Sequence, residues 1–97
     1  MEPQINASIQ VVPINNPEAI PFIDRAIDLI RQSGLEYEVG PFSTSVEGSL
    51  PDFLNLTQKI RSAVHEAGLE EVLINIQIHS HAQTHVRAKD KTQAHRP

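Results

Sequence analysis

Two stretches of the chain carry apolar residues at helical spacing. In the first, from about Pro17 to Ser33, charged residues occupy the opposite side, and Gly34 ends the pattern as a left-handed C-cap. The second begins at Ser49, which precedes Asp52 by three residues as in a capping box, and ends at Gly68. We therefore expect two amphipathic helices with these apolar stripes: Ile20, Ile23, Ile27 and Ile30, then Phe53, Leu56, Ile60, Val64 and Ala67.

Four shorter stretches alternate apolar and polar residues, which is typical of half-buried strands. They span residues 5–12, 35–39, 42–47 and 72–78. With the helices, they give the order βαββαβ. This order predicts an α+β fold, the ferredoxin-like sandwich: an antiparallel four-stranded sheet in the order 4-1-3-2, with two helices on one face.

The two halves of the chain resemble each other. A shift of 34 residues aligns Pro17 with Pro51 and Gly34 with Gly68, and Leu-Glu follows each glycine. These matches fall at the ends of the expected helices, where a structural repeat would show.

Charge divides the chain into two parts. Residues 1–79 carry eleven acidic and four basic residues, whereas residues 80–97 carry four basic residues against Asp90. An acidic body repels phosphate backbones, so we expect no nucleic-acid partner. Beyond Ser80 there is one aliphatic residue larger than alanine, so we expect a ligand-binding domain over 1–79 and a flexible basic, His-containing tail over 80–97.

Several classes of function have no support in the sequence. The chain has no cysteine, no Gly-rich phosphate loop and no Ser-His-Asp arrangement in a supporting context, so we expect neither an enzyme nor a bound cofactor. His79, His81 and His85 lack a cysteine or nearby carboxylate that would complete a metal site, so we expect no metal. No signal-like start or run of about 18 apolar residues occurs, and we expect a cytoplasmic protein with no membrane partner.

One face of the expected sheet is polar but mostly uncharged. Such a face suits hydrogen bonding to a ligand or to another sheet, and it also occurs on ordinary solvated sheets. A chain this short buries little surface, which favours self-association. Alternation places these residues on that face: Asn6, Ser8, Gln10, Ser43, Ser45, Glu47, Asn75 and Gln77.

Glu47 is the most informative single residue on this face. It ends a strand beside Gly48, so its carboxylate has room for a cationic ligand, or it is a solvated acid near a helix start. Tyr37 and Phe42 point to the core by alternation, where they either pack or form a stacking wall for a flat ring.

Three runs resemble the small thiamine-binding proteins of the MTH1187/YkoF (UPF0045) type: residues 11–14, 33–41 and 44–48. The resemblance covers residues 4 to about 78. It implies a ferredoxin-like domain that associates through its sheets into dimers or tetramers and binds thiamine or its hydroxymethylpyrimidine moiety without catalysis. Gln10 departs from the family pattern, which often has a serine three residues before the strand-one proline.

This resemblance and the polar face together give a site hypothesis. Glu47 is the charge partner of the ligand, Tyr37 stacks nearby, and thiamine is expected to bind better than its diphosphate because the surface is acidic. The alternative is an oligomeric interaction or scaffold module with no small ligand. The residues expected to frame the ring are Gln10, Ser43, Thr44 and Asn75.

Overall fold

The computed structural model describes residues 2–95. Every pair of neighbouring strands is antiparallel, and the sheet order is β2-β3-β1-β4, as the sequence predicts. The ferredoxin-like α+β fold is therefore confirmed. Its elements are β1 (Ile5–Ile14), α1 (Ala19–Gln32), β2 (Glu36–Val39), β3 (Thr44–Gly48), α2 (Leu50–Glu66), β4 (Glu71–His79), α3 (Ala88–Thr92) and the 3-10 helix η1 (Gln93–His95).

The ends of both long helices follow the sequence signals. Ser49 caps α2, and its Oγ accepts a hydrogen bond from the Asp52 N–H at 3.2 Å. Gly34 and Gly68 follow α1 and α2 with φ of +80° and +107°, a region that side-chain-bearing residues rarely adopt. The predicted cap and both predicted stop signals are confirmed.

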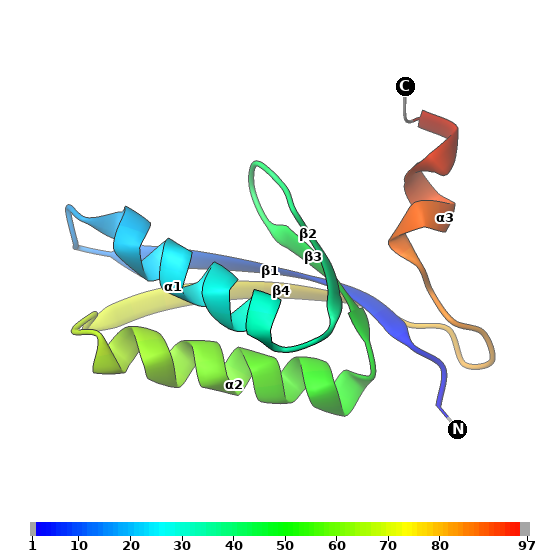
Figure 1. Cartoon of the computed structure of the whole chain (residues 1–97), viewed down its shortest axis with the longest axis horizontal. Coiled ribbons are helices and arrows are strands. Elements are labelled where there is room, and N and C mark those ends of the chain that lie inside the picture. Colours follow the sequence, from blue (N-terminus) through cyan, green and yellow to red (C-terminus); the bar gives the residue numbers. More distant parts are fainter. Residues whose placement is uncertain (1, 96–97) are drawn as a thin grey trace.

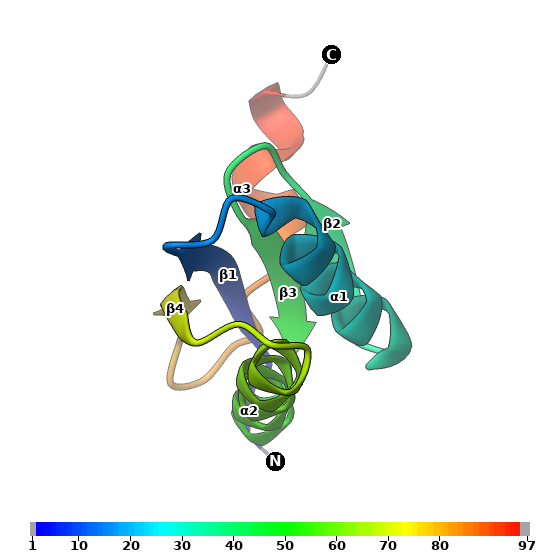
Figure 2. The ribbon, with the colours of Figure 1, turned by 90° about the vertical axis from the view of Figure 1, so that its left-hand side faces the viewer.

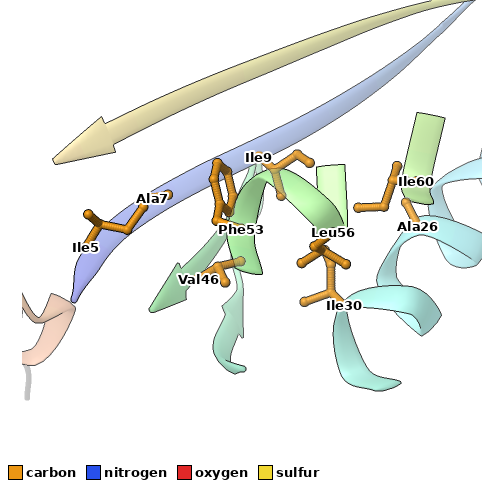
Figure 3. Packing of buried hydrophobic residues seen from close by; sticks show 9 residues of the cluster. All are labelled: Ile5, Ala7, Ile9, Ala26, Ile30, Val46, Phe53, Leu56 and Ile60. Carbon is orange, nitrogen blue, oxygen red and sulfur yellow. The ribbon is translucent and has the colours of Figure 1, made fainter. Parts of the chain in front are cut away.

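The core lies between the sheet and the two long helices. Ile5, Ala7 and Ile9 of β1 alternate toward it, where they meet Phe53 and Ile60 of α2, and α1 contributes further apolar side chains (Figure 3). Both helices lie next to each other against the sheet, and α3 stands apart from them (Figures 1 and 2). The other face of the sheet, which we call the open face, carries the even-numbered residues of β1 from Asn6 onward.

Two local expectations are wrong. Phe42 was expected in a strand and facing the core, but β3 begins only at Thr44, and Phe42 is 83% exposed. The reason is a turn closed by a hydrogen bond of 2.9 Å from the Gly40 N–H to the Ser43 carbonyl. Gly48 does not supply the space expected beside Glu47 either: it faces the helices, and a Cβ there would lie 2.7 Å from Cδ2 of Leu35.

The segment after β4 returns to the N-terminal end of β1. The Val86 N–H donates to the Gln4 carbonyl at 3.0 Å, and the Gln4 N–H donates to His85 Nδ1 at 2.8 Å. Val86 is buried, and α3 follows it. The sequence did not predict this helix. The flexibility of residues 80–97 stays a prediction; residues 85 and 86 contact the domain through these bonds, and residues 96–97 lie outside the described part of the chain.

Candidate ligand-binding site

A cavity of about 340 Å³ lies between the open face of the sheet and the C-terminal segment. We call it the Glu47 cavity. Its size is within the usual range of small-molecule pockets. The sheet contributes Glu36, Tyr37, Glu38, Ser45 and Glu47, and the C-terminal segment contributes Arg87, Ala88, Lys89 and Gln93.

The sheet wall of this cavity is acidic. Glu36 lies directly opposite Glu47, and Glu38 lies opposite Ser45, so these side chains share the open face. Cβ atoms of opposed residues are about 5 Å apart. The side chains of Glu36 and Glu47 therefore start next to each other on the open face, and two acidic side chains on one wall favour a cation beside them.

Glu47 is held in place from the opposite wall. Its Oε1 accepts a hydrogen bond from the Ala88 N–H, a residue from the far end of the sequence. An ionised carboxylate has about four lone-pair sites, so one such bond leaves capacity for a ligand. The bond orients the carboxylate at the edge of the cavity without using up its acceptors.

Asn6 supports the same corner of the site. It is only 7% exposed, and its Nδ2 donates to Ser45 Oγ at 3.0 Å and to the Val46 carbonyl at 3.2 Å. Buried amides require such partners. Because Ser45 lines the Glu47 cavity, Asn6 fixes the hydroxyl that the cavity presents.

The other residues of the site hypothesis lie elsewhere. Asn75 Nδ2 donates to Gln10 Oε1 at 3.2 Å, and the two are opposed on the open face. Gln10 follows Asn6, the register partner of Glu47, by four residues. At about 3.3 Å per strand residue, that separation is roughly 13 Å. The pair is therefore a separate polar cluster.

Thr44 and Tyr37 belong to the side of the sheet that faces the helices. Thr44 is buried and opposite Ile9, and Tyr37 is opposite the fully buried Val46 on the edge strand β2. Tyr37 is 40% exposed and still borders the Glu47 cavity. Alternation along β2 places Tyr37 on the face opposite to that of Glu36 and Glu38.

A second hollow, of about 400 Å³, receives part of the predicted set. It lies between α1 and the turn at residues 40–43, is mainly apolar, and is bordered by Gln10, Ser43 and Thr44. The structure thus brings Glu47 and Tyr37 to one cavity, Gln10, Ser43 and Thr44 to another, and Asn75 to Gln10. It does not bring the six residues together.

Sequence reasoning missed most of the lining of the Glu47 cavity. A hairpin register would have placed Glu36 and Glu38 beside Glu47, because both alternate away from the core. The opposite charges of body and tail were a signal that the two meet. Nothing in the sequence identified Ala88 or Gln93.

The histidines near the end of β4 have roles in hydrogen bonds. His79 Nδ1 lies 2.9 Å from Lys91 Nζ, and His81 Nδ1 accepts from the N–H groups of Gln83 and Thr84 at 3.0 and 3.2 Å. Within residues 2–95, no three metal-ligating side chains gather in a way that could hold an ion. Over the same residues, no helix is long and apolar enough to span a membrane.

The fold and this cavity define a class: a small ferredoxin-like domain with a pocket on the open face of its sheet. The sequence profile of the thiamine-binding proteins matches residues 7–96, so this chain belongs to the thiamine-binding protein family. The matched region extends beyond residue 79 and includes the C-terminal segment.

Relatives of known sequence or structure agree with this membership. A UPF0045 protein of Clostridium perfringens is 30% identical over 74 residues, which are 75% of this chain and 78% of that protein. A DUF77 domain of Bacillus cereus has a TM-score of 0.92 at 35% identity and covers 99% of this chain and 93% of its own. A Thermotoga maritima protein named for thiamine biosynthesis or salvage has a TM-score of 0.88 at 27% identity, with 97% and 100% covered. The UPF0045 thiamine-binding family is not a known enzyme family.

Proposed function

We propose that this protein binds thiamine, or its hydroxymethylpyrimidine moiety, in the Glu47 cavity and catalyses no reaction. Family membership supports the ligand class. The observation that carries the location is the carboxylate of Glu47, oriented by the Ala88 N–H at the edge of a 340 Å³ cavity.

The chemistry of the ligand matches the chemistry of the walls. The thiazolium ring of thiamine is a permanent cation, which the carboxylates of Glu36 and Glu47 stabilise. The aminopyrimidine offers donors and acceptors in one plane. The hydroxyl of Ser45 and the amide of Gln93 are hydrogen-bond partners for it. Stacking on Tyr37 is not part of this arrangement, because alternation along β2 places Tyr37 on the face opposite to Glu36 and Glu38.

The proposal also retains two sequence-based expectations. The protein acts in the cytoplasm, and it self-associates as a dimer or tetramer. Gln10, Ser43, Thr44 and Asn75 lie outside the Glu47 cavity and are assigned no ligand contact in it.

Thermal unfolding of the purified full chain tests the proposal. Scans are run with thiamine, with hydroxymethylpyrimidine and with an uncharged aromatic control of similar size. A ligand at 100 times its dissociation constant stabilises by about 2.7 kcal/mol, which shifts the melting temperature of a domain of this size by roughly 10–20 °C. Unchanged melting temperatures with both compounds, up to millimolar concentration, would refute the proposal.

A second candidate, an oligomeric scaffold module without a small ligand, has one observation in its favour. Leu73, Ile76 and Ile78 of the edge strand β4 are each 39–50% exposed. Exposed apolar side chains on an edge strand are typical of a contact surface. This candidate predicts a stable oligomer with no thermal response to thiamine, so the same scans separate the two functions.

A further inference from the structure

The Glu47 cavity has a basic wall opposite its acidic wall. Arg87 and Lys89 line it, one on each side of Ala88, whose N–H holds Glu47. Adjacent Cα atoms are about 3.8 Å apart, so both cationic side chains begin within one residue of that hydrogen bond. The site therefore contains fixed groups of both signs.

The position of the basic wall is set by the fold. Val86 is buried and bonded to the Gln4 carbonyl, and Lys91 Nζ lies 2.9 Å from His79 Nδ1 at the end of β4. These attachments lie before and after residues 87–89 in sequence. They hold the segment against the domain on both sides of Arg87 and Lys89, which are themselves exposed.

The two cations are not engaged by carboxylates within the described part of the chain, where the one ion pair that forms joins Arg31 and Asp28. Guanidinium and ammonium groups beside a cavity are the usual partners of phosphate. The acidic wall suits the cationic ring of the proposed ligand, so the basic wall is left for an anionic group on the same molecule.

We propose that this site takes a phosphate monoester of the thiamine-type ligand in preference to the free alcohol, with the phosphate on Arg87 and Lys89 and the cationic ring on the side of Glu47. This inference rests on the proposed function, and it reverses the sequence-based expectation that phosphate weakens binding. That expectation assumed that no basic segment lies near the site, whereas the structure places one on its wall.

Isothermal titration of the full chain with thiamine and with thiamine monophosphate tests the inference. A phosphate monoester carries close to two negative charges at neutral pH, and a charge-assisted contact to two cations gives about tenfold tighter binding or more. The preference for the monophosphate should shrink as salt increases from 50 to 500 mM, because the two cations are exposed.

Two double variants with the same change in net charge provide the contrast. Arg87→Gln with Lys89→Gln should abolish the preference for the monophosphate by weakening monophosphate binding about tenfold or more. Lys59→Gln with Arg61→Gln, on the exposed side of α2 and on the other face of the sheet, should keep the preference. The control separates a local phosphate contact from an effect of overall charge.

The outcomes distinguish this inference from the function on which it rests. Suppose that thiamine binds, that its binding depends on Glu47, and that the monophosphate binds no more tightly than thiamine. This result overturns the inference and leaves the proposed function standing. A preference for the monophosphate that survives Arg87→Gln with Lys89→Gln also overturns it. If neither compound binds the parent chain, both proposals are wrong.

Discussion

The carboxylate of Glu47, at the end of β3, accepts a hydrogen bond from the backbone N–H of Ala88, 41 residues further along the chain. This contact joins the two parts of the sequence that differ most in charge. It gives the candidate site one wall from the sheet and one from the C-terminal segment. The ferredoxin-like domain without the C-terminal segment therefore lacks one wall of the site.

Replacing Glu47 by glutamine tests the role of its charge. The amide oxygen of Gln still accepts from the Ala88 N–H, so the fold should be kept, while the attraction to a cationic ring is lost. A charge-assisted hydrogen bond contributes about 1.5–3 kcal/mol, and we expect thiamine affinity to fall by roughly ten- to a hundredfold. Titration calorimetry measures the loss.

The matched control is Glu71→Gln, which removes an exposed carboxylate at the start of β4, the end of the sheet far from Glu47. It should leave thiamine affinity unchanged within about twofold. Equal affinities for the parent and for Glu47→Gln would mean that Glu47 is an ordinary strand-end acid and that the ligand binds elsewhere.

Asn6 provides a test of how the open face is built. Its buried side chain donates to Ser45 and to the Val46 carbonyl, and Asn6→Ala removes both bonds. Leaving buried acceptors unpaired costs about 1–3 kcal/mol, so the free energy of unfolding should fall by that amount in urea titrations. Ser8→Ala, on the same face of β1, should change it by less than about 0.5 kcal/mol. A similar effect of both variants would contradict a specific role for Asn6.

The sequence predicted the fold well because the fold depends on local signals. Period-two alternation identified all four strands, and Ser49, Gly34 and Gly68 marked helix ends that the structure shows. The strand order followed from the order of elements. The sequence could not predict the turn that exposes Phe42, because the bond between Gly40 and Ser43 depends on where β3 begins.

The site was predicted much less well, because it depends on contacts between distant residues. Alternation placed Glu47 on the correct face of the sheet. It did not separate residues of that face that lie far apart along a strand, such as Asn6 and Gln10, so it assigned both ends of the face to one site. It also could not show that Val86 is buried against the start of β1. The sequence showed the charge difference between the body and the C-terminal segment, but it did not show that the two form opposite walls of one cavity.

The two helix-ending glycines yield a prediction about stability. A Cβ at Gly34 or Gly68 would meet no atom within 4 Å, so any cost of an alanine there comes from the backbone alone. With φ of +80° and +107°, each substitution should destabilise by about 1–2 kcal/mol. The sites lie at the ends of different helices, so the double variant should lose the sum. Urea unfolding of the three variants checks this, and an alanine at either site without effect would contradict the backbone argument.

The exposed apolar residues of β4 predict self-association. Ile76 and Ile78 lie at a sheet edge, where an unpaired strand is a template for another chain. We expect sedimentation equilibrium to show a dimer or tetramer at micromolar concentration and Ile76→Lys with Ile78→Lys to yield monomers. Ile20→Lys, at a more exposed position on α1, should not change the assembly. A parent chain that sediments as a monomer at 100 µM would contradict this expectation.

The C-terminal segment gives a prediction that separates attachment from flexibility. The amides of Val86 and Ala88 donate to Gln4 and Glu47, so their exchange with deuterium should be slower than in an unstructured chain, whereas residues 81–84 should exchange quickly because their bonds are local and exposed. Val86→Ser removes the one buried apolar side chain described in the segment and should return both amides to fast exchange. A saturating ligand should slow the Ala88 amide further if it binds between the two walls. Exchange at unstructured rates throughout residues 80–95 of the parent chain would show a flexible tail, and would remove the basic wall from the site.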